Sequence, residues 1–154
     1  MCTTGLLERL QERTQYCRTN IGEITLIVIS SYKSITDEMV VLNQNQLYKL
    51  GEDIQKLRLA PYKSVYYAEY KFNLRGDGKE LTDLFKTGAF QLGFYVYFQG
   101  EMYGIDSTDE KTSALIEKYG ENIFGLTEEN KEVTYFILKP YLQERVLEIL
   151  NGAT

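Results

Sequence analysis

The sequence carries two β-prone runs, Phe94-Tyr95-Val96-Tyr97-Phe98 and Met102-Tyr103-Gly104-Ile105, on either side of Gln99-Gly100. Aromatic and β-branched residues are enriched in strands, and a short connection containing glycine is typical of a tight hairpin turn. The stretch therefore predicts a β-hairpin with arms at residues 89–99 and 101–106. Because a hairpin pairs its strands antiparallel, it favours a sheet with antiparallel neighbours over an all-parallel one.

Further strands are predicted outside the hairpin. Residues 24–29 are almost continuously apolar and rich in β-branched side chains, as in a central strand covered on both faces. Residues 63–74 alternate between two sets of side chains, as in a long strand with two distinct faces. Residues 133–138 have the same β-prone composition, and residues 39–42 form a candidate short strand.

Helical periodicity appears between these stretches. Residues 5–18 place Leu6, Leu7, Leu10 and Cys17 on one face. Other helices are predicted around residues 44–57, after a capping box at Ser107–Glu110, and from Pro140 onward. With 154 residues, the chain is expected to form one domain, residues 1–154. We therefore predict a single α+β domain, with a mixed, mostly antiparallel sheet of about five strands packed by four or five helices.

The composition limits the chemistry that this chain can perform. Lysine and arginine number 17 and aspartate and glutamate 22, which gives a net charge of −5, and there is no histidine. The absence of histidine excludes Ser-His-Asp and Cys-His nucleophilic systems and removes the usual general base near neutral pH. An enzyme made from this sequence would use carboxylates, lysine, tyrosine, cysteine or an oxygen-bound metal.

The compartment is predicted from the start of the chain and from the cysteines. The N-terminal residues lead into the charged run 8–13 and lack the apolar region of a secretory signal. No apolar run approaches the roughly 20 residues of a membrane span. Cys2 and Cys17 would lie roughly 22 Å apart on one helix, whereas a disulfide needs Cα atoms within about 7 Å. We expect a cytoplasmic protein with reduced cysteines that does not bind membranes.

Glu69-Tyr70-Lys71 is the sharpest catalytic candidate. On a strand, Glu69 and Lys71 would project from the same face. Asp53 could supply an upstream carboxylate, with Glu23 or Asp37 as alternatives. This arrangement resembles that of metal nucleases of the PD-(D/E)xK type, and the resemblance covers three residues. It implies Mg²⁺ held by two carboxylates while the lysine orients the attacking water. The alternative is a half-exposed strand face, and the net negative charge argues against a nucleic-acid substrate.

Tyrosine is abundant, with 13 residues, and many of them fall on the predicted strands. Tyrosine supplies a large contact area at low entropic cost, so a tyrosine-rich sheet suits a protein-binding surface. The alternatives are rings buried in the sheet with hydroxyls in solvent, and base stacking. The predicted binding surface comprises Tyr66, Tyr67, Tyr70, Tyr95, Tyr97 and Tyr103.

The remaining polar clusters have structural explanations. Asp106, Asp109 and Glu110 lack the spacing of a calcium loop, and helix capping accounts for them. We therefore expect a non-enzymatic protein–protein interaction, assembly or inhibitory module, by analogy with phage or mobile-element accessory proteins. Its expected partner is another protein or a second copy of the chain, with no cofactor and no metal. The Mg²⁺-dependent nuclease that uses Asp53, Glu69 and Lys71 is the alternative.

Overall fold

The computed structural model describes residues 3–152. Helix α1 spans Thr3–Thr19, α2 Ile21–Ser31 and α3 Lys33–Asn45, and the π-helical turn η1 (Gln46–Leu50) extends α3. Helix α4 spans Val65–Arg75 and the short α5 spans Ala89–Leu92. Strands β1 (Phe94–Gln99) and β2 (Met102–Ser107) are followed by α6 (Thr112–Tyr119), the 3-10 turn η2 (Glu121–Ile123) and α7 (Glu128–Asn151).

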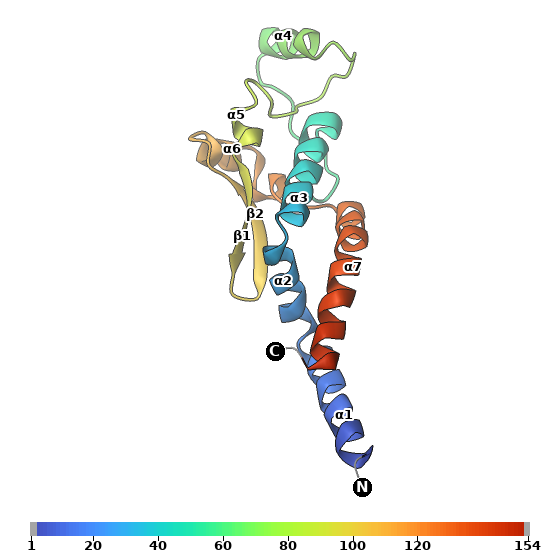
Figure 1. Ribbon diagram of the computed structural model, residues 1–154. Coiled ribbons are helices and arrows are strands. Elements are labelled where there is room, and N and C mark those ends of the chain that lie inside the picture. Colours follow the sequence, from blue (N-terminus) through green and yellow to red (C-terminus); the bar gives the residue numbers. More distant parts are fainter. Residues whose placement is uncertain (1–2, 153–154) are drawn as a thin grey trace.

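The helices give the molecule an elongated shape (Figure 1). Helices α1, α2 and α3 succeed one another along the long axis, and α7 packs against all three. The hairpin packs on α3, on the side away from α7. Helix α4 lies at the end opposite α1, so the two ends of the molecule are built from different parts of the chain.

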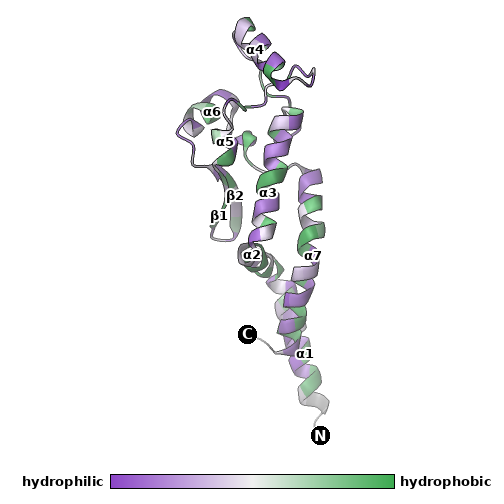
Figure 2. Cartoon of the chain, turned by 45° about the horizontal axis from the view of Figure 1, so that its top comes forward, coloured by the Kyte–Doolittle hydropathy of each residue, from purple (hydrophilic) through white to green (hydrophobic). Residues whose placement is uncertain are grey.

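The apolar core lies where α2, α3, the hairpin and α7 meet. Its buried members include Val28, Ile35, Met39, Phe94, Ile105 and Leu138. A smaller cluster joins Cys17 of α1, Ile24 of α2 and Ile149 of α7. Figure 2 shows hydrophobic residues over most of the α2 ribbon, as expected for a helix with neighbours on more than one side.

The predicted hairpin is confirmed over residues 94–99 and 102–107, whereas residues 89–92, predicted as part of its first arm, form the helix α5. Strands β1 and β2 pair antiparallel, with Phe94 opposite Ser107 and Gln99 opposite Met102. Phe94 and Ile105 are buried on the face turned toward the core, whereas Tyr95 and Tyr97 lie on the other face. The helix predicted over residues 5–18 is also confirmed, as part of α1.

The predicted five-stranded α+β fold is wrong. Among residues 3–152 the structure contains seven α-helices and one two-stranded sheet. Residues 24–29, predicted as a central strand, lie in α2, and residues 39–42 lie in α3. A short apolar run fits a buried helix as well as a buried strand. In α2, Ile24 and Val28 are one turn apart and both are buried, and this packing outweighs the β-propensity of the branched side chains.

Residues 63–74 were predicted as a strand and instead form most of α4. Ser64 is the N-cap, where its hydroxyl accepts a hydrogen bond from the Tyr67 N–H (3.3 Å). Gly76, at φ 69°, ends the helix in the left-handed conformation that favours glycine. With both ends capped, the eleven residues of α4 form a helix even though their side chains alternate as in a strand.

Residues 133–138 were predicted as a strand, with a helix starting at Pro140, and both belong to the continuous helix α7. Thr127 caps this helix by accepting a hydrogen bond from the Asn130 N–H (3.3 Å), and Glu128 and Glu129 complement the positive end of its dipole. Pro140 lies inside the helix and cannot donate to the Phe136 carbonyl. Both residues are exposed, so water can satisfy that carbonyl.

Two further predictions concern the cysteines and the membrane. Cys17 is a buried free thiol, whereas Cys2 lies outside the described residues. Within residues 3–152, no helix combines the length and the apolar character needed to cross a membrane.

Candidate functional site

The six tyrosines of the predicted binding surface occupy separate parts of the molecule. Tyr66, Tyr67 and Tyr70 lie on α4, where Tyr66 is 86% exposed, Tyr70 is exposed and Tyr67 is half-buried. Tyr95 and Tyr97 lie on β1 with ring centroids 6.4 Å apart. The register places them on one face of the hairpin and Tyr103 on the other. The structure therefore divides these residues between α4 and the two faces of the hairpin.

A glycine on the neighbouring strand leaves room for the ring of Tyr97. Gly104 lies directly opposite Tyr97 in the register. A Cβ atom at Gly104 would come within 2.5 Å of the Tyr97 ring and hydroxyl. The missing side chain at this position lets the tyrosine lie flat across β2.

The three residues of the nuclease hypothesis have separate environments. Asp53 is buried in the loop after η1, where its Oδ1 accepts hydrogen bonds from the N–H groups of Gln55 (2.8 Å) and Leu57 (3.0 Å). Glu69 is exposed on α4, whereas Lys71 is buried on α4. Side chains two positions apart on a helix point about 200° away from each other, so Glu69 and Lys71 do not share a face on α4. Residues 3–152 contain no group of three metal-ligating side chains that could hold an ion.

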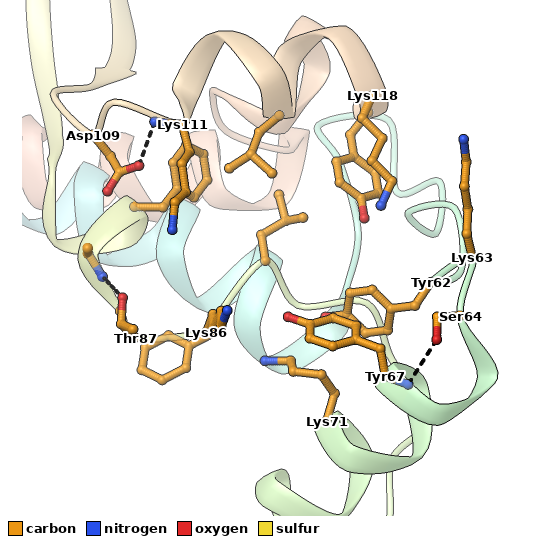
Figure 3. A pocket seen from close by; sticks show the side chains of 17 residues that line it. Tyr62, Lys63, Ser64, Tyr67, Lys71, Lys86, Thr87, Asp109, Lys111 and Lys118 are labelled. Carbon is orange, nitrogen blue, oxygen red and sulfur yellow. Dashed lines mark hydrogen bonds between the residues drawn. The ribbon is translucent and has the colours of Figure 1, made fainter.

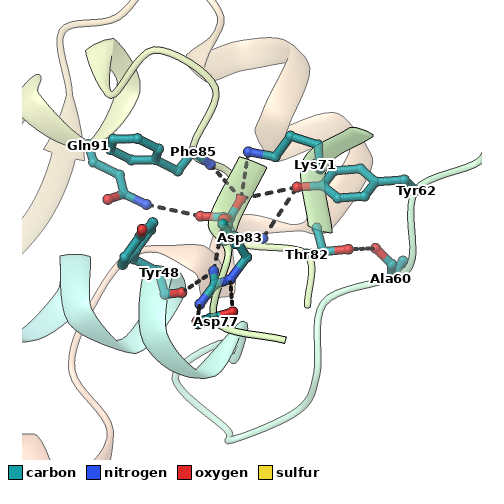
Figure 4. Close-up of polar contacts among 10 residues, drawn as sticks. Tyr48, Ala60, Tyr62, Lys71, Asp77, Thr82, Asp83, Phe85 and Gln91 are labelled. Atoms are coloured by element: carbon teal, nitrogen blue, oxygen red, sulfur yellow. Dashed lines mark hydrogen bonds and ion pairs between the residues drawn. The ribbon is translucent and has the colours of Figure 1, made fainter. Parts of the chain in front are cut away.

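Lys71 belongs instead to a buried network centred on Asp83 (Figure 4). Asp83 is fully buried, and its Oδ1 lies 3.1 Å from Lys71 Nζ. The same oxygen accepts hydrogen bonds from the Tyr62 hydroxyl (3.1 Å) and the Phe85 N–H (2.9 Å). Its Oδ2 accepts from Arg75 Nη1 at 2.9 Å. Two cations and two neutral donors thus surround one carboxylate, which fixes α4 to the loop over residues 76–88.

Arg75 extends this network to η1 and to the turn after α4. Its Nη1 also donates to the Tyr48 carbonyl (2.6 Å), and its guanidinium lies 4.8 Å from the Tyr48 ring centroid. Its Nε and Nη2 donate to the two carboxylate oxygens of Asp77, at 3.2 and 2.8 Å. The turn at Arg75–Gly78 therefore forms one side of this ionic cluster. The sequence signal that could have located this cluster is Asp83 inside the apolar run Leu81–Phe85.

The network shifts the pKa values of its members. Burial and the Asp83 charge raise the pKa of Tyr62 well above its usual range, so its hydroxyl stays a donor. Burial and the same carboxylate also raise the pKa of Tyr67. Hydrogen bonds from Arg75 and from the Lys79 N–H lower the pKa of Asp77 to about 2.

The lowered pKa of Asp77 predicts a pH-dependent contribution to stability. A carboxyl group whose pKa is lower in the folded state stabilises the fold above its unfolded pKa, and this contribution is lost as the pH falls through the folded pKa. The difference in stability between the wild type and Asp77→Asn should therefore shrink as the pH falls from about 5 to about 2. Urea unfolding of both proteins across this range measures the difference, and a constant difference would contradict the assignment.

A second candidate site is an apolar surface around Ile21, at the start of α2. Ile21, Met102, Tyr103 and Leu147 are all exposed there, and we call them the Ile21 surface. Ile21 lines a groove of 550 Å³ against α7, together with Leu142, Gln143, Val146 and Leu147. It also lines a groove of 390 Å³ between α2 and the hairpin tip, whose other lining residues include Met102 and Tyr103. Among residues 3–152, Glu101 is the one charged residue that lines either groove.

The buried ionic cluster beneath α4 and the uncovered apolar surface at α2 are thus distinct features of the described part of the chain. The cluster fixes a loop and uses its donors internally, whereas the apolar surface is open to solvent. Comparisons of the chain with models of protein families, with curated proteins and with solved structures give no match.

Proposed function

We propose that this protein is a non-catalytic assembly module that docks onto protein through the Ile21 surface. The observation that carries the proposal is the pair of apolar grooves that share Ile21 and have one charged lining residue. Apolar surfaces of this kind are typical of protein interaction sites, because covering them releases water. The hairpin tip, α2 and α7 each contribute an exposed side chain to the surface.

We infer that the first occupant to test is a second copy of the chain. Helix α1 extends beyond the C-terminal end of α7 (Figure 1). Arg13 still touches α7, because its Nη1 donates to the Leu150 carbonyl at 2.9 Å. Toward its start the helix exposes Leu6, Leu7 and Leu10, at helical spacing. An amphipathic helix that lays such a stripe into an apolar groove is a common mode of recognition.

The test compares two double variants that remove the same kind of side chain. Ile21→Ser with Leu147→Ser removes two members of the Ile21 surface, and Leu57→Ser with Leu92→Ser removes two exposed leucines elsewhere. Light scattering should give an oligomeric mass for the wild type and the control variant. It should give the monomer mass, 17.9 kDa, for the Ile21 and Leu147 variant.

Two results would count against the proposal. A wild type that stays monomeric at every concentration would contradict self-association. An Ile21 and Leu147 variant with the wild-type mass would exclude the Ile21 surface as the contact. Circular dichroism of both variants checks that the substitutions leave the helices intact.

The analogy with phage and mobile-element accessory proteins stays a prediction within this proposal. An assembly module is expected to be encoded beside the components that it helps to assemble. The neighbouring genes, followed by co-expression of the chain with their products, test this part.

A further inference from the structure

A pocket of 370 Å³ lies between α4, α6 and the segment that leads into α5 (Figure 3). Its walls include the aromatic rings of Tyr62, Tyr67, Phe85 and Tyr119. Leu84 and Leu115 add aliphatic surface. The volume falls in the range of small-molecule sites, and the mixed aromatic and aliphatic wall is typical of them.

The charge of this pocket is opposite to that of the whole protein. Five lysines line it, namely Lys63, Lys71, Lys86, Lys111 and Lys118. Asp109 is the one acidic lining residue in the described part of the chain, and its Oδ1 already accepts a hydrogen bond from the Lys111 N–H at 2.8 Å. A chain with a net charge of −5 therefore gathers positive charge at a single pocket.

Four of these lysines lack a carboxylate partner among the described residues. Lys71 is paired with Asp83, whereas no ion pair within residues 3–152 involves Lys63, Lys86, Lys111 or Lys118. Figure 3 shows Lys71 on the α4 side and Lys111 and Lys118 on the α6 side, so the amines surround the space. Like charges held around one cavity repel one another, and a bound anion would relieve that repulsion.

The backbone adds positive potential at the same place. Ser64 and Lys111, the N-cap residues of α4 and α6, both line the pocket. The N-terminus of a helix carries a partial positive charge and favours anions. The raised pKa of Tyr67 keeps its hydroxyl protonated, so it is a further donor on the pocket wall.

We propose that this pocket binds a small phosphorylated ligand that also carries an aromatic ring, of the mononucleotide class. The four lysines without an ion pair in residues 3–152 and the two helix N-termini would hold the phosphate groups. The rings of Tyr62, Tyr67, Phe85 and Tyr119 would stack on the aromatic part. This site lies at α4 and α6, apart from the Ile21 surface, and the proposal is independent of the assembly function.

Calorimetric titration with three probes tests the assignment. ATP without Mg²⁺ carries both the phosphate groups and the aromatic ring of the proposed ligand. Tripolyphosphate carries only the anionic half, and adenosine carries only the aromatic half. ATP should bind most tightly, and its affinity should fall as salt is added. Equal affinity for ATP and tripolyphosphate would overturn the aromatic half of the assignment. Equal affinity for ATP and adenosine, or no binding of any probe, would overturn the proposal.

A charge-matched pair of triple variants locates the binding. Lys63→Gln, Lys86→Gln and Lys118→Gln remove pocket amines, and Lys49→Gln, Lys79→Gln and Lys139→Gln remove three exposed lysines elsewhere. The pocket variant should bind ATP at least about tenfold more weakly than the control variant. Without ligand, the melting temperature of the pocket variant should be no lower than that of the control variant, because removing the amines relieves the repulsion among them. Equal ATP affinity of the two variants would overturn the proposed site.

Discussion

Replacing Asp83 with alanine is expected to lower the free energy of unfolding by about 3–5 kcal/mol, as is found when one partner of a buried ion pair is removed. The carboxylate is fully buried, and Lys71 and Arg75 beside it are nearly so. Without Asp83, Lys71 stays buried and loses its one ion-pair partner in residues 3–152. Urea unfolding followed by circular dichroism measures the change.

Asp77→Ala is the matched control, because it removes the other carboxylate of Arg75. Asp77 is exposed, and water can replace it at the guanidinium, so its loss should cost much less than the loss of Asp83. A double variant, Asp83→Leu with Lys71→Met, should be more stable than the sum of its own two single substitutions predicts, because it removes the buried carboxylate and the buried amine together. Similar losses for Asp83→Ala and Asp77→Ala would contradict the buried network.

The hairpin and the first helix could be predicted from local sequence because their signals do not compete. The hairpin combines β-prone arms with a short turn containing glycine at Gln99-Gly100. Residues 5–18 show a single apolar stripe with charged residues around it, which fits a helix and no strand. In both stretches, composition and periodicity indicate the same structure.

The strands predicted at residues 24–29, 63–74 and 133–138 were wrong because composition and packing disagree there. Ile24, Val28 and Leu138 are β-branched or large apolar residues, and each is buried in a helix. In the structure, the hydroxyls of Ser64 and Thr127 cap the starts of α4 and α7. Intrinsic propensity contributes less than burial and capping do, so β-prone composition did not decide these segments.

The chemical environment of Lys71 depended on long-range contacts. On a strand it would have shared a face with Glu69, whereas on α4 it points at Asp83, twelve positions further along the chain. The loop that carries Asp83 has no periodic pattern, and its position is set by Arg75, Tyr62 and the backbone of Tyr48. The apolar neighbours of Asp83 indicate that it is buried, but no local pattern identifies the residues that pair with it.

Met39 and Val41 provide the sharpest test of helix against strand. On the predicted strand over residues 39–42, the two side chains would lie on the same face and would be buried or exposed together. On α3 they point about 200° apart, and Met39 is 0% exposed whereas Val41 is 43% exposed. The helix therefore predicts that two truncations only two residues apart have very different effects.

Met39→Ala is expected to lower the free energy of unfolding by about 2–5 kcal/mol, because it opens a cavity in the main core. Val41→Ala should change it by no more than about 0.5 kcal/mol, because the valine is half in solvent and alanine favours helix. Urea unfolding of both variants under the same conditions measures the two changes. Comparable losses at the two positions would indicate a shared face and would contradict α3, whereas a large loss at Met39 alone requires the helix.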